Sequence, residues 1–546
     1  MSSDVLRVEL ERVARKLGDG DIEFVLERPR DDTHGDLATN LALTLAKRRR
    51  SNPRAVAEEV LRELQAPATL IAKTEIAGPG FINFWFASDT LAALHARILA
   101  EGARYGTSAV GEGRKVNLEF VSANPTGPLH VGHGRGAALG DAIASLLQWS
   151  GHSVTREFYI NDAGVQIDRL AQSLWARVQQ SVGREAAIPD GGYHGMYLQE
   201  NAALVLEREG QSFADLPYEE GVKRSRELGL AIQREEQDKD LADFGVRFDV
   251  MTSEQGMYHR SAVSMALDLL HDRNLTYEKD GALWLRTSEF GDDLDRVLRK
   301  QDGSYTYFLP DIAYHIDKLE RKFDALIDVW GADHHGYIPR VRAVLRALGF
   351  EDEKFDVVLV QLVKVVRGGE EVKMSKRAGT FVTLRDLVDE VGTDAARWFF
   401  LSRKGDSQLT FDIELAKRQT DENPIFYVQM AHARLCGIFR TAGVEPDTVT
   451  GALDLASLPA PEDTELLKKL AELPEVVAKA AQEREPHRVT THLHELATCV
   501  HGWYHHTRTV GEPADIEHAR LLLARAARVT LANGLAVLGL SAPERI

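Results

Sequence analysis

Long apolar runs are missing from this 546-residue chain, and cysteine is scarce. No run reaches the roughly 18 apolar residues of a transmembrane helix, so we expect no membrane span. The first residues carry no basic stretch followed by an apolar core, so we expect no signal peptide. The two cysteines, Cys436 and Cys499, exclude a disulfide-rich scaffold and give no CxxC zinc spacing. The expected location is therefore the reducing cytoplasm.

An excess of positive charge is also lacking. The formal net charge of −17 argues against a protein that coats nucleic acid by bulk electrostatic attraction. It does not exclude RNA binding, because a large acidic protein can carry local basic surfaces. The cluster Lys47–Arg50 is either such a surface or a solvated helix end. The length predicts several domains.

Turn residues and the spacing of apolar residues divide the chain into three expected domains. Residues 1–105 predict a small α+β domain. Residues 106–400 alternate strands with helices, which is typical of a doubly wound, Rossmann-like parallel sheet, and they carry a charged helical insertion at about 170–250. Residues 401–546 predict helices alone. The expected fold class is a multidomain α/β protein.

Local patterns also predict individual elements. In the first domain we expect helices through Leu6–Leu17 and Leu37–Leu45 and a third helix after an Asn52 cap. Phe81–Phe86 is expected to be a strand. In the second domain the Asn124–Pro128 turn separates a strand from an alanine-rich helix. The strands expected there lie at 116–120, 154–160, 282–285, 305–309, 324–330 and 355–360.

A pair of histidines opens this alanine-rich helix, in the segment His130-Val131-Gly132-His133. The unpaired N–H groups of a helix N-terminus suit a phosphate, and histidines three residues apart can both reach phosphoryl oxygens. Gly132 has no β-carbon, so we expect adenine to lie against its backbone. Taken alone, the pair is equally compatible with structural histidines or a partial metal site.

A second motif, Lys373-Met374-Ser375-Lys376, lies in a glycine-flanked loop, residues 367–380. Lysines on a mobile loop can close over a triphosphate and neutralise the charge that develops on departing pyrophosphate. A lysine-rich exposed loop is also common without any function. The two motifs together, in this order and on opposite halves of the predicted sheet, favour an ATP site.

The two motifs resemble the signature sequences of class I aminoacyl-tRNA synthetases, and the segments around them resemble arginyl-tRNA synthetases. The resemblance covers essentially the whole chain. It implies a Rossmann-like catalytic domain of HUP type, an N-terminal domain that contacts tRNA, and a C-terminal all-α anticodon-binding bundle. The implied reaction is ATP-dependent activation of L-arginine to arginyl-adenylate and transfer to the 3′ end of tRNA(Arg), which releases AMP and pyrophosphate. The resembling segments are 33–40, 119–128, 159–164, 302–307, 311–315 and 330–335.

Two carboxylates are candidates for holding a guanidinium, a planar group of donors that favours paired hydrogen bonds with carboxylates. Glu119 lies in a predicted core strand, where a charge requires a partner. Asp311 is expected at the end of the 305–309 strand, where open α/β sheets bind ligands. Either carboxylate could instead belong to a structural ion pair. The resemblance implies an arginine pocket formed by Glu119, Ser122, Asn124, His130, Tyr307, Asp311, Asp333 and His334.

The resemblance also implies roles for both signature motifs. His130, His133, Lys373 and Lys376 are the expected catalytic residues. ATP is expected to enter with Mg²⁺ as a substrate complex, no tightly bound cofactor is expected, and no residue is assigned to a metal. The expected ATP-binding residues are Pro128, His130, Gly132, His133, Lys373, Met374, Ser375 and Lys376.

Two surfaces are expected to face tRNA. Phe81 and Asn83 lie on one face of the aromatic strand, where a ring could stack on a base and an amide could read its edge. A plain core strand explains the aromatic residues almost as well. The resemblance implies that these positions contact the D-loop and that Tyr427 and Arg434 belong to the anticodon-binding bundle. We expect a monomer.

Three alternatives stay open at this point. A class I synthetase for another amino acid would not need Glu119. A nucleotidylyltransferase shares the HxGH motif but lacks a C-terminal helical bundle and a KMSK loop. A non-catalytic tRNA-binding descendant of a synthetase would not need intact histidines and lysines in the two motifs.

Overall fold

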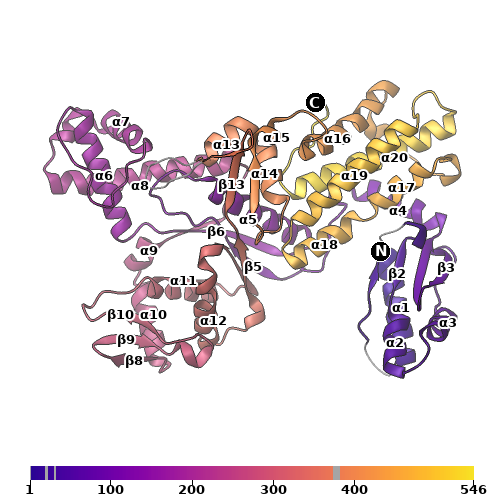
Figure 1. Cartoon of the computed structure of the whole chain (residues 1–546), viewed down its shortest axis with the longest axis horizontal. Coiled ribbons are helices and arrows are strands. Elements are labelled where there is room, and N and C mark those ends of the chain that lie inside the picture. The colour runs from indigo at the N-terminus through magenta and orange to yellow at the C-terminus, as the bar shows by residue number, and fades with distance from the viewer. Residues whose placement is uncertain (1, 19–21, 30–31, 373–381) are drawn as a thin grey trace.

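The computed structural model describes residues 2–18, 22–29, 32–372 and 382–546. Figure 1 shows a small N-terminal domain below one end of a long helical bundle, with the catalytic core and its two lobes at the other end. The predicted multidomain α/β fold is confirmed. Among the described helices, none is both long and apolar enough to cross a lipid bilayer.

The N-terminal domain packs three helices against an antiparallel sheet of strand order β1-β2-β4-β3. The expected cap is present, because the Asn52 side chain accepts a hydrogen bond from the first turn of α3 at 2.9 Å. The expected helix across Leu37–Leu45 is too long: Leu37 pairs with Phe84 in the sheet, and the helix begins at Leu41. The elements are α1 (Ser2–Gly18), β1 (Leu26–Glu27), β2 (Leu37–Thr39), α2 (Leu41–Arg49), α3 (Pro53–Glu63), β3 (Ile71–Ala77), β4 (Phe81–Phe86) and the connecting α4 (Ser88–Glu101).

The catalytic core is a five-stranded, all-parallel sheet of order β12-β11-β5-β6-β7. Four of the predicted strands form part of it. Alternate residues of β5 face opposite sides: Val116 and Leu118 pack in the core that contains α5, whereas Glu119 faces α11. The elements are β5 (Lys115–Glu119), α5 (Val131–Trp149), β6 (Ser153–Ile160), β7 (Val250–Ser253), α11 (Phe308–Glu320), β11 (Ala325–Gly331) and β12 (Phe355–Val360).

The predicted strand at 305–309 is wrong, because α11 begins at Phe308. Tyr305 forms only an isolated β-bridge with Arg299. Phe308 and Ile312 recur at helical spacing and are both buried. Pro310 lies in the first turn, where the missing N–H removes no intrahelical hydrogen bond. The helical spacing of buried residues from Phe308 onward therefore determines the structure here, and the short apolar run at 305–309 does not form a strand.

Two lobes project from the core on the left of Figure 1. The predicted helical insertion forms one lobe with its own hydrophobic core. The predicted strand at 282–285 is β9, which belongs to a separate antiparallel sheet of order β10-β9-β8 in the other lobe. The helical lobe contains α6 (Val165–Ser181), α7 (Tyr197–Glu209) and α8 (Tyr218–Asp243). The other lobe contains α9 (Glu254–His259), α10 (Ala262–Asp272), β8 (Thr276–Lys279), β9 (Ala282–Leu285), β10 (Arg296–Arg299) and α12 (Ile338–Ala347).

A third small sheet links the core to the C-terminal bundle. Its order is β14-β13-β15, and β13 and β15 are parallel. The predicted all-helical C-terminal part is confirmed beyond β15. The elements are β13 (Val363–Arg367), β14 (Glu370–Glu371), α13 (Leu384–Val391), α14 (Thr393–Leu401), β15 (Leu409–Asp412), α15 (Ile413–Lys417), α16 (Pro424–Ala442), α17 (Pro461–Leu470), α18 (Leu473–Glu483), α19 (His487–His506) and α20 (Ala514–Val537).

The N-terminal domain is joined to the bundle by ion pairs. Lys468 Nζ lies 2.7 Å from Asp36 Oδ1, and Arg28 Nε lies 3.7 Å from Glu472 Oε1. A groove of about 1100 Å³ lies at this junction, lined by both parts and by α4. No predicted site residue within the described ranges lines this groove, so its volume does not mark the chemistry.

Candidate active site

A row of three carboxylates crosses the catalytic sheet on the face that α11 covers. Asp328 of β11, Glu119 of β5 and Glu157 of β6 are register partners on neighbouring parallel strands, so their side chains point to the same face. All three are buried. Like charges at adjacent buried positions require nearby cations.

Helix α11 and its end supply these cations. Lys318 is fully buried, and its Nζ donates to Glu119 Oε2 at 2.6 Å and to Asp328 Oδ1 at 2.8 Å. Arg321 Nη2 lies 2.8 Å from Glu157 Oε2. The sequence left open whether Glu119 belongs to an ion pair, and the structure shows that it does. Burial and the adjacent Asp328 raise the pKa of Glu119, although Lys318 opposes both effects.

His315 links Asp311 to this row. Asp311, His315 and Lys318 recur at helical spacing on one face of α11. His315 Nδ1 lies 2.9 Å from the Asp311 carbonyl oxygen, and Nε2 lies 3.2 Å from Asp328 Oδ2. Both ring nitrogens face acceptors, so the imidazole carries two protons. Burial lowers the pKa of His315, but the two carboxylates outweigh this effect and raise it to about 10.

A strained turn at the end of β5 positions the Glu119 carboxylate. Val121 and Ser122 have φ angles of 69° and 40°, a left-handed conformation that is rare for non-glycine residues and clusters at functional sites. Ser122 Oγ donates to Glu119 Oε1 at 2.8 Å and accepts from the Tyr159 N–H at 3.1 Å. The turn therefore places a hydroxyl beside the carboxylate.

The other residues predicted for the arginine pocket lie closer to the surface. Asn124 donates from its side chain to Gln166 of α6 at 2.9 Å. Tyr307, directly before α11, is 74% exposed. Asp333 and His334 follow β11 and are also exposed, with 3.6 Å between the His334 Nε2 and Asp333 Oδ2 atoms. Asp311 was predicted at the end of a strand, and this is wrong: it lies in the first turn of α11.

Several polar residues of this site were missed from the sequence. The Tyr159 hydroxyl donates to Glu254 Oε2 at 3.0 Å, and burial raises the pKa of Glu254. Lys318 and His315 were missed because 305–309 was taken for a strand, which hid the polar face of the helix. Asp328 could have been noticed as a single charge within an apolar strand.

The two histidines of the first motif form the N-terminal cap of α5. His130 Nδ1 accepts from the backbone N–H groups of Gly132 at 3.1 Å and His133 at 3.4 Å. The His133 ring stacks on the His130 ring with 3.7 Å between centroids. A β-carbon on Gly132 would lie 2.9 Å from the His130 ring. A side chain at Gly132 would therefore collide with the capping ring.

The second motif, Lys373 to Lys376, lies outside the described residues. The segment that follows it contacts the first motif directly. Val131 N–H donates to Val382 O at 3.3 Å, and Leu384 N–H donates to Leu129 O at 2.7 Å. The backbone thus holds residues 382–384 against the start of α5.

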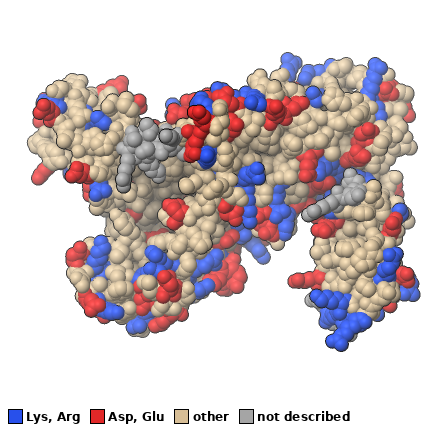
Figure 2. Space-filling view, viewed as in Figure 1, with Lys and Arg blue, Asp and Glu red and all other residues tan. Residues whose placement is uncertain are grey.

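The surfaces predicted to face tRNA differ in exposure. On β4, Phe81 is 41% exposed, whereas Asn83 is buried. Figure 2 shows basic side chains gathered at the lower end of the N-terminal domain, where α2 ends. On α16, Arg434 Nη1 lies 2.7 Å from His501 Nδ1, and the Tyr427 hydroxyl lies 3.4 Å from Thr498 Oγ1.

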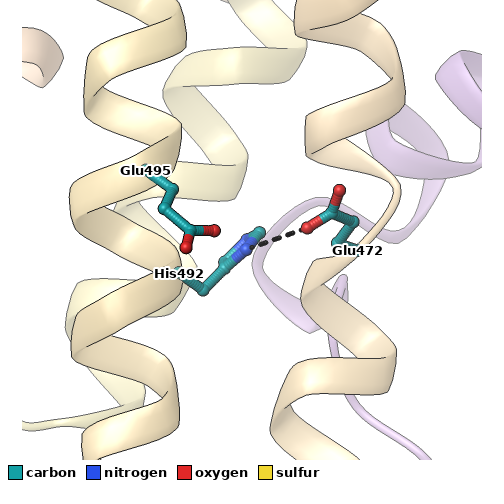
Figure 3. A group of neighbouring side chains, drawn as sticks. All are labelled: Glu472, His492 and Glu495. Carbon is teal, nitrogen blue, oxygen red and sulfur yellow. Dashed lines mark ion pairs between the residues drawn. The ribbon is translucent and has the colours of Figure 1, made fainter. Parts of the chain in front are cut away.

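One group in the bundle has the composition of a metal site. Figure 3 shows Glu472, His492 and Glu495 facing one another, with possible ligand atoms within 4.8 Å. Lys469 Nζ lies 2.9 Å from Glu472 and 2.6 Å from Glu495. Burial raises the pKa of Glu472, but His492, Arg28 and Lys469 outweigh it and lower the pKa to about 2. The lysine already supplies the cation, so we assign no metal here.

Three family profiles match consecutive parts of the chain. Residues 95–435 match the catalytic domain of class I (R) tRNA synthetases, residues 428–546 match the DALR anticodon-binding domain, and residues 3–86 match the arginyl-tRNA synthetase N-terminal domain. The chain belongs to the arginyl-tRNA synthetase family. It is an aminoacyl-tRNA ligase that activates arginine with ATP and charges tRNA, as predicted. This membership decides against the three alternatives.

Individual arginyl-tRNA synthetases agree with this assignment along the whole chain. The arginine–tRNA ligase of Anoxybacillus flavithermus is 47% identical over 524 residues, which cover 96% of this chain and 94% of the relative. That of Bacillus licheniformis is 45% identical over 549 residues, with 100% and 99% covered. The Thermus thermophilus arginyl-tRNA synthetase structure has a TM-score of 0.78, 24% identity and full coverage of both chains, which shows the same fold.

Proposed function

We propose that this synthetase binds arginine with its guanidinium between Glu119 and Asp311. The main support is the buried network that joins these two carboxylates through Lys318, Asp328 and His315. Within it, the Asp311 and Glu119 side chains are 26% and 8% exposed, whereas Asp328 is fully buried. Of the three carboxylates, Glu119 and Asp311 are therefore the two that keep some accessibility, which suits a planar fork of donors.

The remaining roles follow from the position of this acidic pocket beside the start of α5. Ser122, Asn124 and His130 lie along the chain between Glu119 and the helix, so they face the α-amino and carboxylate end of arginine. Tyr307, Asp333 and His334 line the entrance. ATP enters with Mg²⁺, and its phosphates lie at the N-terminus of α5. The residues assigned to ATP are Pro128, His130, Gly132, His133, Lys373, Met374, Ser375 and Lys376.

The domains divide the recognition of tRNA(Arg). We assign residues 1–105 to the D-loop, residues 106–400 to catalysis and residues 401–546 to the anticodon. The exposed Phe81 ring stacks on a base, and Asn83 supports its strand from a buried position. Tyr427 and Arg434 lie on the anticodon-facing helix α16. The protein acts as a monomer in the cytoplasm.

The pocket assignment is tested with Glu119→Gln, which keeps the side-chain shape and removes the charge. Charging of tRNA(Arg) is measured with arginine and with the other nineteen amino acids. Leaving a buried charged group without its partner costs about 3–5 kcal/mol, so kcat/KM for arginine should fall by a factor between roughly 10² and several times 10³. Glu278→Gln, an exposed residue paired with Arg299 far from the row, is the control. Unchanged use of arginine by Glu119→Gln would sink the assignment.

The dependence of arginine activation on tRNA gives a second test. The family resemblance implies that arginine activation requires bound tRNA. Arginine-dependent ATP–pyrophosphate exchange should therefore appear only when tRNA(Arg) is present. Exchange at a comparable rate without tRNA would contradict this part of the proposal and leave the pocket assignment intact.

A further inference from the structure

Lys318 occupies a position that the arginine-binding role does not explain. Its ammonium group is fully buried and lies 2.6 Å from Glu119 and 2.8 Å from Asp328. It also lies 4.4 Å from the ring centroid of Tyr314. A lysine is almost never fully buried unless it is paired, and here the ammonium contacts two carboxylates and a ring face. Its place between two register partners indicates that it separates their charges.

The charges around Lys318 do not cancel. Glu119, Asp328 and Asp311 are three carboxylates, and Lys318 and the doubly protonated His315 are two cations. Arg321 is shared between Glu157 and Asp317 and forms no ion pair with these five groups. Counted over these five ion-paired groups, one negative charge is left over.

This remaining charge lies at the ligand side of the network. Asp328 is held by both Lys318 and His315, whereas Glu119 has only a share of Lys318 and a hydroxyl donor from Ser122. Asp311 Oδ2 is buried without a well-formed hydrogen bond, although the Asp311 side chain interacts with the Tyr337 hydroxyl. An unpaired buried carboxylate oxygen is costly, so it favours a donor from outside the chain.

We infer that Lys318 and His315 are positioning residues, which hold Glu119 and Asp311 in place and leave the pocket with one uncompensated negative charge that selects a singly charged side chain. This inference rests on the proposed function. An amino acid with a neutral side chain of the same shape would leave the pocket's buried negative charge unpaired. This energetic penalty excludes such an amino acid from the pocket. The guanidinium of arginine supplies one charge and donors for both carboxylates.

The first test is Lys318→Met. Without the ammonium, the neighbouring carboxylates Glu119 and Asp328 would face each other directly. His315 would be the one cation left to balance them and Asp311. Glu119 then takes up a proton and loses its charge-assisted contact with arginine. The KM for arginine should rise by at least about 100-fold while the KM for ATP stays within about threefold. An unchanged or lower KM for arginine in the folded variant would overturn the inference.

The second test restores the balance with Lys318→Met combined with Asp328→Asn. This variant loses one cation and one carboxylate, so Glu119 should ionise again. We expect at least about a tenfold recovery of the KM for arginine over Lys318→Met, which a merely structural lysine would not show. If the single variant does not fold, the double variant must fold and bind arginine within about tenfold of the unmodified enzyme. A double variant that is unfolded or no better than the single one overturns the inference.

Glu119→Gln separates this inference from the proposed function. If Glu119→Gln leaves arginine use unchanged, the proposed pocket is wrong and the role of Lys318 falls with it. If Glu119→Gln is severe but Lys318→Met is not, the pocket stands and only the positioning role fails. Thermal unfolding of each variant shows whether the fold is retained.

Discussion

The two faces of strand β5 differ in the kind of partner that they need. One face carries Val116 and Leu118, which are buried among the apolar residues of the core around α5. The other face carries Asn117 and Glu119, which are also buried and contact charged groups from β6 and α11. Adjacent residues of one short strand therefore belong to environments that respond to different changes.

This difference teaches where stability and specificity lie in the catalytic domain. The apolar face depends on volume and close packing, because non-directional burial drives it. The acidic face depends on charge balance and hydrogen-bond geometry, because each buried ion is costly unless it is paired. Changes to the first should alter unfolding, and changes to the second should alter the binding of arginine.

Leu118→Ala gives the largest expected loss of stability on the apolar face. The side chain is fully buried, so its truncation leaves a cavity and should lower the free energy of unfolding by about 2–5 kcal/mol. Urea or thermal unfolding measures this effect. At a temperature where the variant is folded, the KM for arginine should stay within about threefold. A large rise in this KM with unchanged stability would break the comparison.

Glu157→Gln examines the far end of the acidic row. Its carboxylate accepts hydrogen bonds from Asn117, Thr252 and Arg321, so the loss of its charge should cost about 1.5–3 kcal/mol of stability. Since the Glu157–Arg321 pair lies outside the proposed pocket, the KM for arginine should change far less than in Glu119→Gln. An equal rise in both variants would show that the whole row binds the substrate.

Gly140→Ala examines the contact between α5 and the chain at the end of β5. An added β-carbon would lie 2.2 Å from the Phe120 ring, and such overpacking costs about 1–3 kcal/mol. Gly136→Ala on the same helix is the control. Its β-carbon would meet no atom within 4 Å, so the better helix propensity of alanine should add about 0.5–1 kcal/mol. The prediction fails if thermal unfolding shows that both substitutions stabilise the protein, or that both destabilise it.

The pH dependence of arginine binding gives the smallest expected effect. Because burial and Asp328 raise the pKa of Glu119 above its ordinary value of 4.5, this carboxyl takes up a proton at a higher pH than usual. Protonation removes the charge that holds the guanidinium, so the KM for arginine should rise on acidification, and this rise should begin at a higher pH than an ordinary carboxyl would cause. In Glu119→Gln the dependence should disappear. A pH profile shared by both proteins would assign it to another group.

Residues with a local signature could be assigned from the sequence. Asn52 caps a helix as predicted, and the His130–His133 segment begins one, because both depend on residues close in the chain. Asp311 was chosen as a site residue but placed at the end of a strand, since the short apolar run at 305–309 does not by itself distinguish a strand from the start of a helix. The first turn of α11 explains its position better.

Long-range partners could not be read from the chain. Lys318 and Glu119 are 199 residues apart and in direct contact, and no local pattern indicates their pairing. The tRNA-facing residues show the same limit: alternation along β4 predicted the positions of Phe81 and Asn83, but not that only Phe81 is exposed.

The sequence by itself determined the two motifs and the candidate carboxylates, because these follow from residue types and short spacings, and it indicated the class of enzyme through a family resemblance. The tertiary structure alone decided how the candidates are held. It brought Asp328, Glu119 and Glu157 into register and placed Lys318 between two of them. The physical reason is that the balance of charge in a buried site is a sum over neighbours in space, and most of these neighbours are distant in the chain.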